Sequence, residues 1–428
     1  MSEEKSSGGG VLSWNHVLSL YIPGMLLMLG SSMVAPVIPV YAKSFEVTLT
    51  TASWVFVAYA TGSVAATFPA GLMMDKIGRR PVVLAGPIIT AIAAFLTPHS
   101  TTFYELLFWR FLSGAAQQLW QQGRLAVIAD TARHRERARL VQWMQGMGRG
   151  GQLVGPALGG FLAAAMGVSI PFYVYGLVTL IAVLPSFKLI KETAPELRQR
   201  KSGEAAVEDT GWKGVLAFMF TFQMMVFLTV QLLANMSRGG QEYGSLNLYA
   251  VYAYNMGPAT LGLLSTIAIV FGIPVPFLSG YLMDKFGRRS VIVPGFSLFG
   301  VALVCMSLTS FASMPVEFFM VMYVIVQATQ GVTGGTMQVL GTDLSPTTGR
   351  GKFFGIWRMI SQIGAAITPA IFAFIADTFG YGSGFIYLAL CAGGVALGVG
   401  VVLGDTLAKA DREDREKSGE VAAKQAPA

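Results

Sequence analysis

Apolar stretches long enough to cross a membrane recur along almost the whole of this 428-residue chain. A helix needs about 20 apolar residues to cross a hydrocarbon core of about 30 Å. Inside a bilayer the backbone must satisfy its own hydrogen bonds, so each stretch is expected to be helical. The sequence predicts an all-α membrane protein with twelve transmembrane helices, at residues 17–41, 50–74, 81–98, 102–127, 139–166, 169–187, 213–235, 257–283, 290–312, 315–341, 352–377 and 382–404.

The composition and the charge distribution agree with a membrane protein. Hydrophobic residues make up 53% of the chain and charged residues 12%, whereas soluble domains carry about 25% charged residues. The net charge is +7, and most of the 30 Lys and Arg gather in segments on one side of the expected membrane. Only Lys43 and Arg238 fall in segments on the other side. The positive-inside rule then places both termini in the cytoplasm, and the basic excess needs no nucleic-acid partner.

Neither a metal site nor a disulfide framework is indicated. The two cysteines, Cys305 and Cys391, lie in separate apolar stretches, and the three histidines are far apart in the sequence. No nucleophile and base are spaced as in an enzyme active site. The first apolar stretch is too long for the core of a signal peptide, so we expect it to remain as the first helix. No metal and no cofactor are therefore expected.

A ten-residue pattern occurs once in each half of the chain. Gly71-Leu-Met-Met-Asp-Lys-Ile-Gly-Arg-Arg80 recurs 209 positions later as Gly280-Tyr-Leu-Met-Asp-Lys-Phe-Gly-Arg-Arg289. Parallel repeats of this kind are a transporter architecture, with the substrate site near the middle of the membrane. We expect two pseudo-symmetric six-helix bundles at residues 1–189 and 213–404, joined by a polar cytoplasmic linker (190–212) and followed by a polar tail (405–428).

This repeated pattern resembles the G-x-x-x-D-[RK]-x-G-R-[RK] motif of the major facilitator superfamily. The resemblance implies that both copies take part in gating at the cytoplasmic side, where each carboxylate pairs with arginines and helix ends. A basic loop that only sets the topology is the alternative. The gating residues implied by the resemblance are Gly71, Asp75, Gly78, Arg79, Arg80, Gly280, Asp284, Gly287, Arg288 and Arg289.

The fifth stretch resembles the G-x-x-x-G-P-x-x-G-G element of exporter branches, above all the twelve-helix drug:proton antiporters. The residues concerned are Gly151, Gly155, Pro156, Gly159 and Gly160. In the first stretch, Leu29-Gly30 followed by Pro36 and Pro39 is similar to a second pattern of that branch. The element implies export, although such glycines also serve ordinary close packing between helices.

Polar side chains form stripes on several of the expected helices. Arg110, at the start of an element similar to the family's R-x-x-x-G pattern, shares one helix face with Gln117, Gln121 and Arg124. A charge inside a bilayer must face a cavity or a partner. Arg124 lies near enough to the helix end to reach the cytoplasmic interface instead. The candidate substrate and coupling residues are Arg110, Gln117, Gln121, Gln145, Arg149, Gln223, Gln327, Arg358 and Gln362.

No acidic residue lies deep in any expected helix. Glu105, Glu317, Asp130 and Asp343 are all placed near helix ends, and the first helix contains none. A cavity with arginines and no deep carboxylate favours neutral or anionic small molecules over lipophilic cations. Coupling to a proton gradient is therefore implied by the family resemblance alone.

The function that we predict is export of small organic molecules by alternating access, with proton antiport as the implied driving mechanism. Import or uniport of an organic anion or a sugar is the alternative within transport, and a non-transporting membrane receptor is the alternative from another class. We expect a monomer in a bacterial inner (plasma) membrane. No nucleotide-binding G-x-x-x-x-G-K-[ST] loop is present to support ATP-driven pumping.

Overall fold

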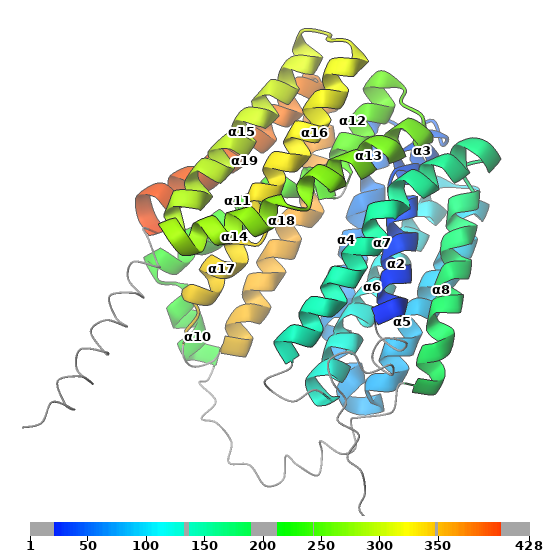
Figure 1. Ribbon diagram of the computed structural model, residues 1–428, viewed down its shortest axis with the longest axis horizontal. Coiled ribbons are helices and arrows are strands. Elements are labelled where there is room, and N and C mark those ends of the chain that lie inside the picture. Colours follow the sequence, from blue (N-terminus) through cyan, green and yellow to red (C-terminus); the bar gives the residue numbers. More distant parts are fainter. Residues whose placement is uncertain (1–20, 132–136, 190–211, 243, 347–349, 404–428) are drawn as a thin grey trace, which may run out of the picture. The chain divides into compact units, whose positions relative to one another are not determined.

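The computed structural model describes residues 21–131, 137–189, 212–242, 244–346 and 350–403, which fold almost entirely into helices (Figure 1). The predicted linker and tail lie outside these residues, apart from Trp212 at the start of a helix. The described helices belong to two compact units. One unit comprises residues 1–205 together with 247–266, and the other comprises 206–246 together with 267–428.

In the first unit the chain forms six transmembrane helices, one of them in two pieces. They are α2 (Ile22–Val34) with α3 (Val37–Lys43), α4 (Leu49–Ile77), α5 (Arg79–Leu96), α6 (Phe103–Thr131), α7 (Arg137–Met166) and α8 (Ile170–Leu189). The short turn η2 (Thr97–His99) follows α5. Pro36 separates α2 from α3, because proline cannot continue the hydrogen-bond ladder of the preceding helix.

The second half of the chain repeats this series with more interruptions. A short helix α10 (Trp212–Met219) precedes α11 (Phe222–Glu242), α12 (Ser245–Tyr254), α13 (Pro258–Gly272), α14 (Val275–Phe286), α15 (Arg289–Phe311), α16 (Val316–Thr333), α17 (Thr336–Asp343), α18 (Arg350–Phe379), α19 (Tyr381–Gly398) and η3 (Val399–Leu403). Three membrane crossings are built from two helices each, namely α11 with α12, α13 with α14, and α16 with α17.

Helical segments of the described residues lie at each of the twelve predicted crossings. Nine crossings are long and apolar enough by composition alone. The other three are α6, α7 and the segment formed by α11 and α12, which carry Arg110, Arg149 and Arg238 respectively. These three segments are less apolar than the other nine because they contain more charged and amide side chains.

The two halves pack their helices in the same way. In the first half α2 lies against α7 and α8, and α5 lies against α6 and α8. At the equivalent places of the second half, α11 lies against α18 and α19, and α15 lies against α16 and α19. The pair of α4 and α6 corresponds to the pair of α14 and α16. This repeated pairing confirms the pseudo-symmetry predicted from the duplicated motif.

The duplicated motif forms the same turn in both halves. Gly78 and Gly287 have φ values of +99° and +91°, a left-handed backbone region that favours glycine. In each copy the next arginine reaches back to a carbonyl at the end of the preceding helix. Arg79 Nη1 donates to Met74 O at 3.1 Å, and Arg288 Nη1 donates to Met283 O at 3.4 Å. A guanidinium at a helix C-terminus is electrostatically favourable.

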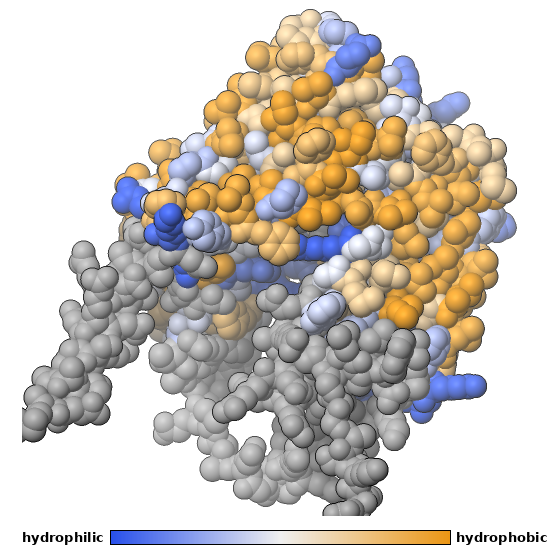
Figure 2. Space-filling view, viewed as in Figure 1, coloured by the Kyte–Doolittle hydropathy of each residue, from blue (hydrophilic) through white to orange (hydrophobic). Residues whose placement is uncertain are grey.

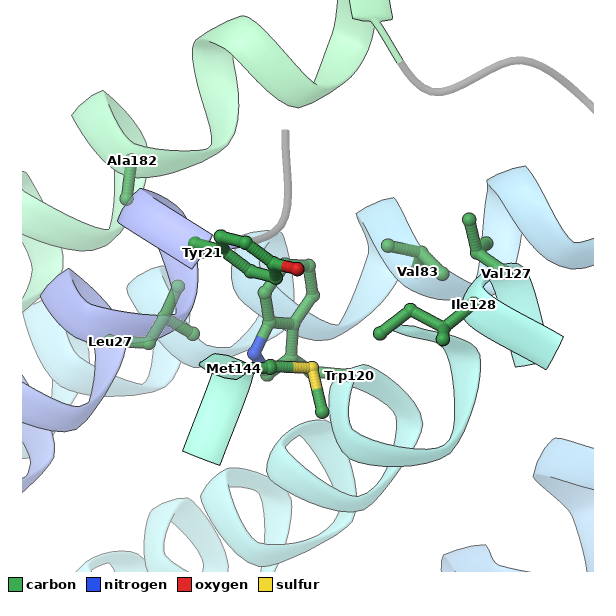
Figure 3. Close-up of a cluster of buried hydrophobic side chains, with 8 residues drawn as sticks. All are labelled: Tyr21, Leu27, Val83, Trp120, Val127, Ile128, Met144 and Ala182. Carbon is green, nitrogen blue, oxygen red and sulfur yellow. The ribbon is translucent and has the colours of Figure 1, made fainter. Parts of the chain in front are cut away.

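Hydrophobic side chains cover much of the visible helical surface (Figure 2). On α19, for example, Leu390 and Leu397 are 71% and 68% exposed. Contiguous apolar exposure on this scale is unfavourable in water and suits lipid. Inside the first unit, side chains from five helices enclose Trp120, and Figure 3 shows Met144 beside its ring.

The seventh crossing differs from its prediction. The sequence placed this helix at 213–235 with Arg238 in an outer segment, whereas α11 continues to Glu242 and is followed by α12 up to Tyr254. Arg238 is thus a helical residue of α11, four residues before the end of that helix at Glu242. The prediction stopped the helix early because charged residues inside a bilayer are rare.

Candidate functional site

Arg110 lies among aromatic and polar side chains from three other helices of the first unit. Its guanidinium carbon is 4.7 Å from the centroid of the Tyr59 ring on α4. It also interacts with Tyr175 on α8, which shares a hydrogen bond with Ser31 on α2. The Arg110 Nε is buried without a hydrogen-bond partner. We call these four residues the Arg110 cluster.

Two glycines allow the Arg110 cluster to form. A Cβ on Gly114 would clash with Tyr59 O, so this glycine lets the backbones of α6 and α4 touch beside the cluster. A Cβ on Gly30 would meet the Tyr175 ring, with Cε2 only 2.8 Å away. Both glycines were noted in the sequence as parts of family-like patterns, and here they leave room for the two tyrosines. The stacked guanidinium retains an unused donor, which suits an anionic or hydrogen-bond-accepting group.

The glutamines that share a helix face with Arg110 have different surroundings. The side-chain oxygen of Gln117 is buried without a partner, whereas Gln121 accepts a hydrogen bond from Arg124 Nη2 at 3.0 Å. The neighbouring Gln118, which the sequence analysis did not single out, accepts from Ser63 on α4 at 3.2 Å. Gln117 is therefore the glutamine of this stripe with hydrogen-bonding capacity to spare.

The interfacial position considered for Arg124 is wrong. Its side chain is only 1% exposed and lies 5.7 Å from the centroid of the Trp120 ring, which is part of the buried cluster described above. It packs against α2 so closely that a Cβ on Gly24 would be 2.7 Å from Nη1. Its Nε and Nη1 have no hydrogen-bond partner. A guanidinium this deeply buried and this poorly paired destabilises the fold.

Replacing Arg124 with methionine is expected to stabilise the protein. Methionine keeps an unbranched, flexible chain in the same space and removes a buried charge with two unused donors. We expect the unfolding midpoint of the purified protein to rise by about 2 °C or more. The exposed Lys188 supplies the control, since Lys188→Met should leave the midpoint unchanged. A lower midpoint for Arg124→Met would contradict the assignment of an unpaired charge.

The glycines of the fifth crossing pack against two different helices. Gly151, Gly155 and Gly159 face α2, where a Cβ would clash with backbone or side-chain atoms at each position. On another face, Gly160 touches Pro258 and a Cβ on Gly262 would meet Pro156 O. The Gly-Pro element therefore holds α7 tightly between α2 and α13. Whether it also sets the direction of transport remains a prediction from the resemblance.

Lys43 anchors α12 to the end of α3 that lies away from the duplicated motif. Its Nζ donates to Val251 O at 2.9 Å and to Asn255 Oδ1 at 2.6 Å. The ammonium also lies 5.3 Å from the Tyr252 ring centroid, and the Tyr252 hydroxyl donates to Val47 O at 3.1 Å. These bonds explain why residues 247–266 group with the first unit although they belong to the second half of the sequence.

The remaining candidate residues are distributed over several helices. Arg149 on α7 and Arg358 on α18 are exposed, while Gln327 on α16 and Gln362 on α18 are half-buried. Gln223 is exposed at the beginning of α11, far from the middle of that crossing. The side chains of Gln145, Asp75 and Asp284 lie outside the described residues. Among the candidates whose side chains are described, the structure thus assembles a cluster with aromatic residues of other helices around Arg110, and the roles of the others stay predictions.

Three polar residues of α11 were missed by the sequence analysis. Gln231 donates to Ser361 Oγ on α18 at 2.7 Å, and Asn235 donates to Gln231 O at 2.8 Å. Arg238 follows with a buried Nε that has no partner. Their spacing of four and then three residues places them on one helix face. That spacing was visible in the sequence, but the early helix end hid it.

Comparison with known proteins identifies the family. Two overlapping regions, residues 20–253 and 230–427, match the family model described as Major Facilitator Superfamily. The chain belongs to the Major Facilitator Superfamily. It is a multi-pass membrane transporter, and the two matched regions cover almost all described helices of both halves.

Characterised relatives in this superfamily include bacterial resistance proteins. The chain is 24% identical to the quinolone resistance protein NorA of Staphylococcus aureus (strain MRSA252) over 278 residues, which is 63% of this chain and 67% of the relative. It is 23% identical to multidrug resistance protein 2 of Bacillus subtilis (strain 168) over 269 residues, covering 62% and 66%. These matches span about two thirds of each relative.

Solved structures of other transport proteins are similar in fold. A crystal structure of a D-xylose-proton symporter matches with a TM-score of 0.74 at 15% identity, covering 92% of this chain and 98% of that one. A bacterial homologue of the iron transporter ferroportin, in an inward-facing state, matches with a TM-score of 0.68 at 17% identity, covering 89% and 97%. At these identities the matches concern the fold alone.

Proposed function

We propose that this protein is an efflux transporter of small organic molecules that works by alternating access and proton antiport. The observation that carries the proposal is the similarity, over more than 60% of the chain, to proteins named for quinolone and multidrug resistance. The tight packing of the Gly-Pro element of α7 between α2 and α13 gives it structural support. We further propose a bacterial plasma membrane with both termini in the cytoplasm, in accord with the distribution of basic residues.

The charge of the Arg110 cluster favours neutral and anionic cargo. Its guanidinium lies over the Tyr59 ring, interacts electrostatically with Tyr175 and retains an unpartnered Nε, and no carboxylate belongs to the cluster. A lipophilic cation placed here would meet a like charge at short range in a medium of low dielectric constant. A carboxylate or sulfonate would instead gain charge-assisted hydrogen bonds from the guanidinium.

Efflux from intact cells tests this proposal. An efflux-deficient bacterium expressing the protein is loaded with fluorescein through its uncharged diacetate ester, which is cleaved inside to an anion, or with the cation ethidium. We expect fluorescein to leave faster than from cells without the protein, and an uncoupler of the proton gradient to abolish the difference. If each dye leaves cells that express the protein no faster than it leaves cells without the protein, the efflux function is contradicted. Accelerated loss of ethidium alone would contradict the charge preference.

A further inference from the structure

Helices α4 and α6 touch through two glycines beside Arg110. A Cβ on Gly62 of α4 would clash with Phe111 O, and a Cβ on Gly114 of α6 would clash with Tyr59 O. Each glycine therefore faces the backbone of the other helix, and small residues permit such a close approach inside a membrane. The double contact brings Tyr59 on α4 level with Arg110 on α6.

Two side-chain hydrogen bonds continue the same register along this pair of helices. Ser63 Oγ donates to Gln118 Oε1 at 3.2 Å, and Gln122 Nε2 donates to Thr67 O at 3.3 Å. Both bonds join residues that are 55 positions apart, which is also the separation between Gly114 and the α4 residue that it contacts. A constant separation over about two helical turns means that the two parallel helices are paired in a fixed register. Tyr59 is therefore held in a defined position relative to α6.

Tyr59 attracts the Arg110 guanidinium through the face of its ring. The guanidinium carbon lies 4.7 Å from the ring centroid, and both side chains are half-buried. The attraction between a cation and a ring face becomes stronger when water is partly excluded, and it needs no hydrogen-bond acceptor. A carboxylate partner would instead occupy the N–H donors and neutralise the charge. The guanidinium of Arg110 is thus held in place while its charge remains available to a ligand.

The two tyrosines of the Arg110 cluster are held in different ways. Tyr175 is 8% exposed, shares a hydrogen bond with Ser31 and has its ring against Gly30 of α2. Its hydroxyl is therefore engaged by another helix. Tyr59 is held by the backbone contact with α6 and presents its ring to Arg110. The ring of Tyr59 is the part of the cluster that is placed to orient the guanidinium.

We propose that Tyr59 is a positioning residue of the cargo site, whose ring, and not its hydroxyl, orients the Arg110 guanidinium toward the acid group of an organic anion. The proposal rests on the function proposed above and deepens it, since it assigns the residue through which Arg110 becomes selective for anions. An arginine side chain without such a support loses more conformational freedom when it binds a ligand. A guanidinium that is already oriented offers its planar fork of donors to a carboxylate or sulfonate at a lower cost.

Equilibrium binding to the purified full-length protein in a neutral detergent tests this role without requiring transport. The probes are dansylate, an aromatic sulfonate, and dansylamide, its uncharged sulfonamide counterpart. We expect Tyr59→Leu to weaken dansylate binding about fivefold or more and to leave dansylamide binding unchanged, because only the sulfonate depends on the guanidinium. Tyr59→Phe keeps the ring and removes the hydroxyl, so it should lose less than about twofold.

A double-mutant cycle separates positioning from packing. In Arg110→Gln the ring has no cation to hold, so adding Tyr59→Leu should cause no further loss of dansylate affinity. Phe68 on the same helix is 74% exposed and supplies the matched control for removing an aromatic ring. Phe68→Leu should bind dansylate as the unaltered protein does.

Four results would overturn the proposal. They are unchanged dansylate binding by Tyr59→Leu, an equal loss of dansylate and dansylamide affinity in that variant, an equal loss in Tyr59→Phe, and the same loss with and without Arg110. Dansylate binding that depends on Tyr59 only when Arg110 is present would uphold this role even in a protein that moves no dye out of cells, which would contradict the efflux function instead. Efflux of dye by a protein whose dansylate affinity is independent of Tyr59 would contradict this role and leave the efflux function in place.

Discussion

Arg110→Gln is expected to leave the protein folded and to lower export at least about tenfold. The guanidinium stacked on Tyr59 carries a charge that no acid of the cluster neutralises, so its removal lowers a desolvation cost and does not weaken the fold. A substrate carboxylate loses its charged partner at the same time. The expected signature is an unfolding midpoint that is equal or higher, combined with a large loss of fluorescein efflux.

Arg124 on the same helix provides the contrast. It also carries unpartnered donors, but it is 1% exposed against Trp120 and Gly24 and has no access for a substrate. Arg124→Met should therefore raise the midpoint without reducing efflux. If Arg110→Gln exports fluorescein as fast as the unaltered protein, the Arg110 cluster does not handle the substrate.

Gly151→Ala and Gly150→Ala are expected to change stability in opposite directions. A Cβ on Gly151 would clash with Met25 O and approach Leu29 N to 2.9 Å, both in the backbone of α2. Backbone atoms cannot rotate away, so overpacking should cost about 1–3 kcal/mol. A Cβ on Gly150 meets nothing within 4 Å, and alanine should stabilise the helix by about 0.5–1 kcal/mol.

Thermal unfolding of the two purified variants measures this difference. Cys391 is buried and Cys305 half-buried, so a thiol-reactive dye reports their exposure on heating. We expect a midpoint several degrees lower for Gly151→Ala than for Gly150→Ala. Equal midpoints would mean that α7 and α2 do not pack through this face. Gly150 and Gly151 are neighbours on one helix, so the two variants change nearly the same position along the helix. They differ in that only Gly151 packs against the α2 backbone.

The sequence alone predicted most of the architecture because hydrophobic length and the duplicated motif are strong signals. Eleven of the twelve expected helices begin and end close to the helices in the structure, and the repeat led correctly to two similarly packed bundles. The exception was the seventh crossing, in which Arg238 was treated as a residue outside the membrane. A rule based on the average cost of a buried charge disfavours an arginine in a crossing helix, whereas the structure includes Arg238 in α11.

Side-chain partners could not be predicted in the same way. The sequence indicated Arg110 as a functional candidate, but nothing in it pointed to Tyr59 or Tyr175, which come from other helices. Arg124 shares a helix face with Arg110 by periodicity, yet it is buried in the core because α2 approaches closely at Gly24. The direction in which a helix face points depends on its neighbours, which periodicity does not specify.

The helix breaks in the second half could be predicted only in part from the sequence. Pro274 and the Gly334-Gly335 pair are ordinary breaking signals, but similar prolines such as Pro156 and Pro369 lie inside continuous helices. Only the packing of Gly331 against Val275 shows that two breaks adjoin. The proximity of these two breaks therefore required the structure.

Proton movement in reconstituted vesicles tests the central claim most directly. The purified protein is placed in liposomes that contain a pH-sensitive dye, a proton gradient is imposed, and dansylate, dansylamide or ethidium is added. Antiport of organic anions or neutral compounds predicts proton movement that depends on dansylate or dansylamide and is lost in Arg110→Gln. Dansylate transport without proton movement would contradict antiport, and proton movement driven by ethidium alone would contradict the substrate preference.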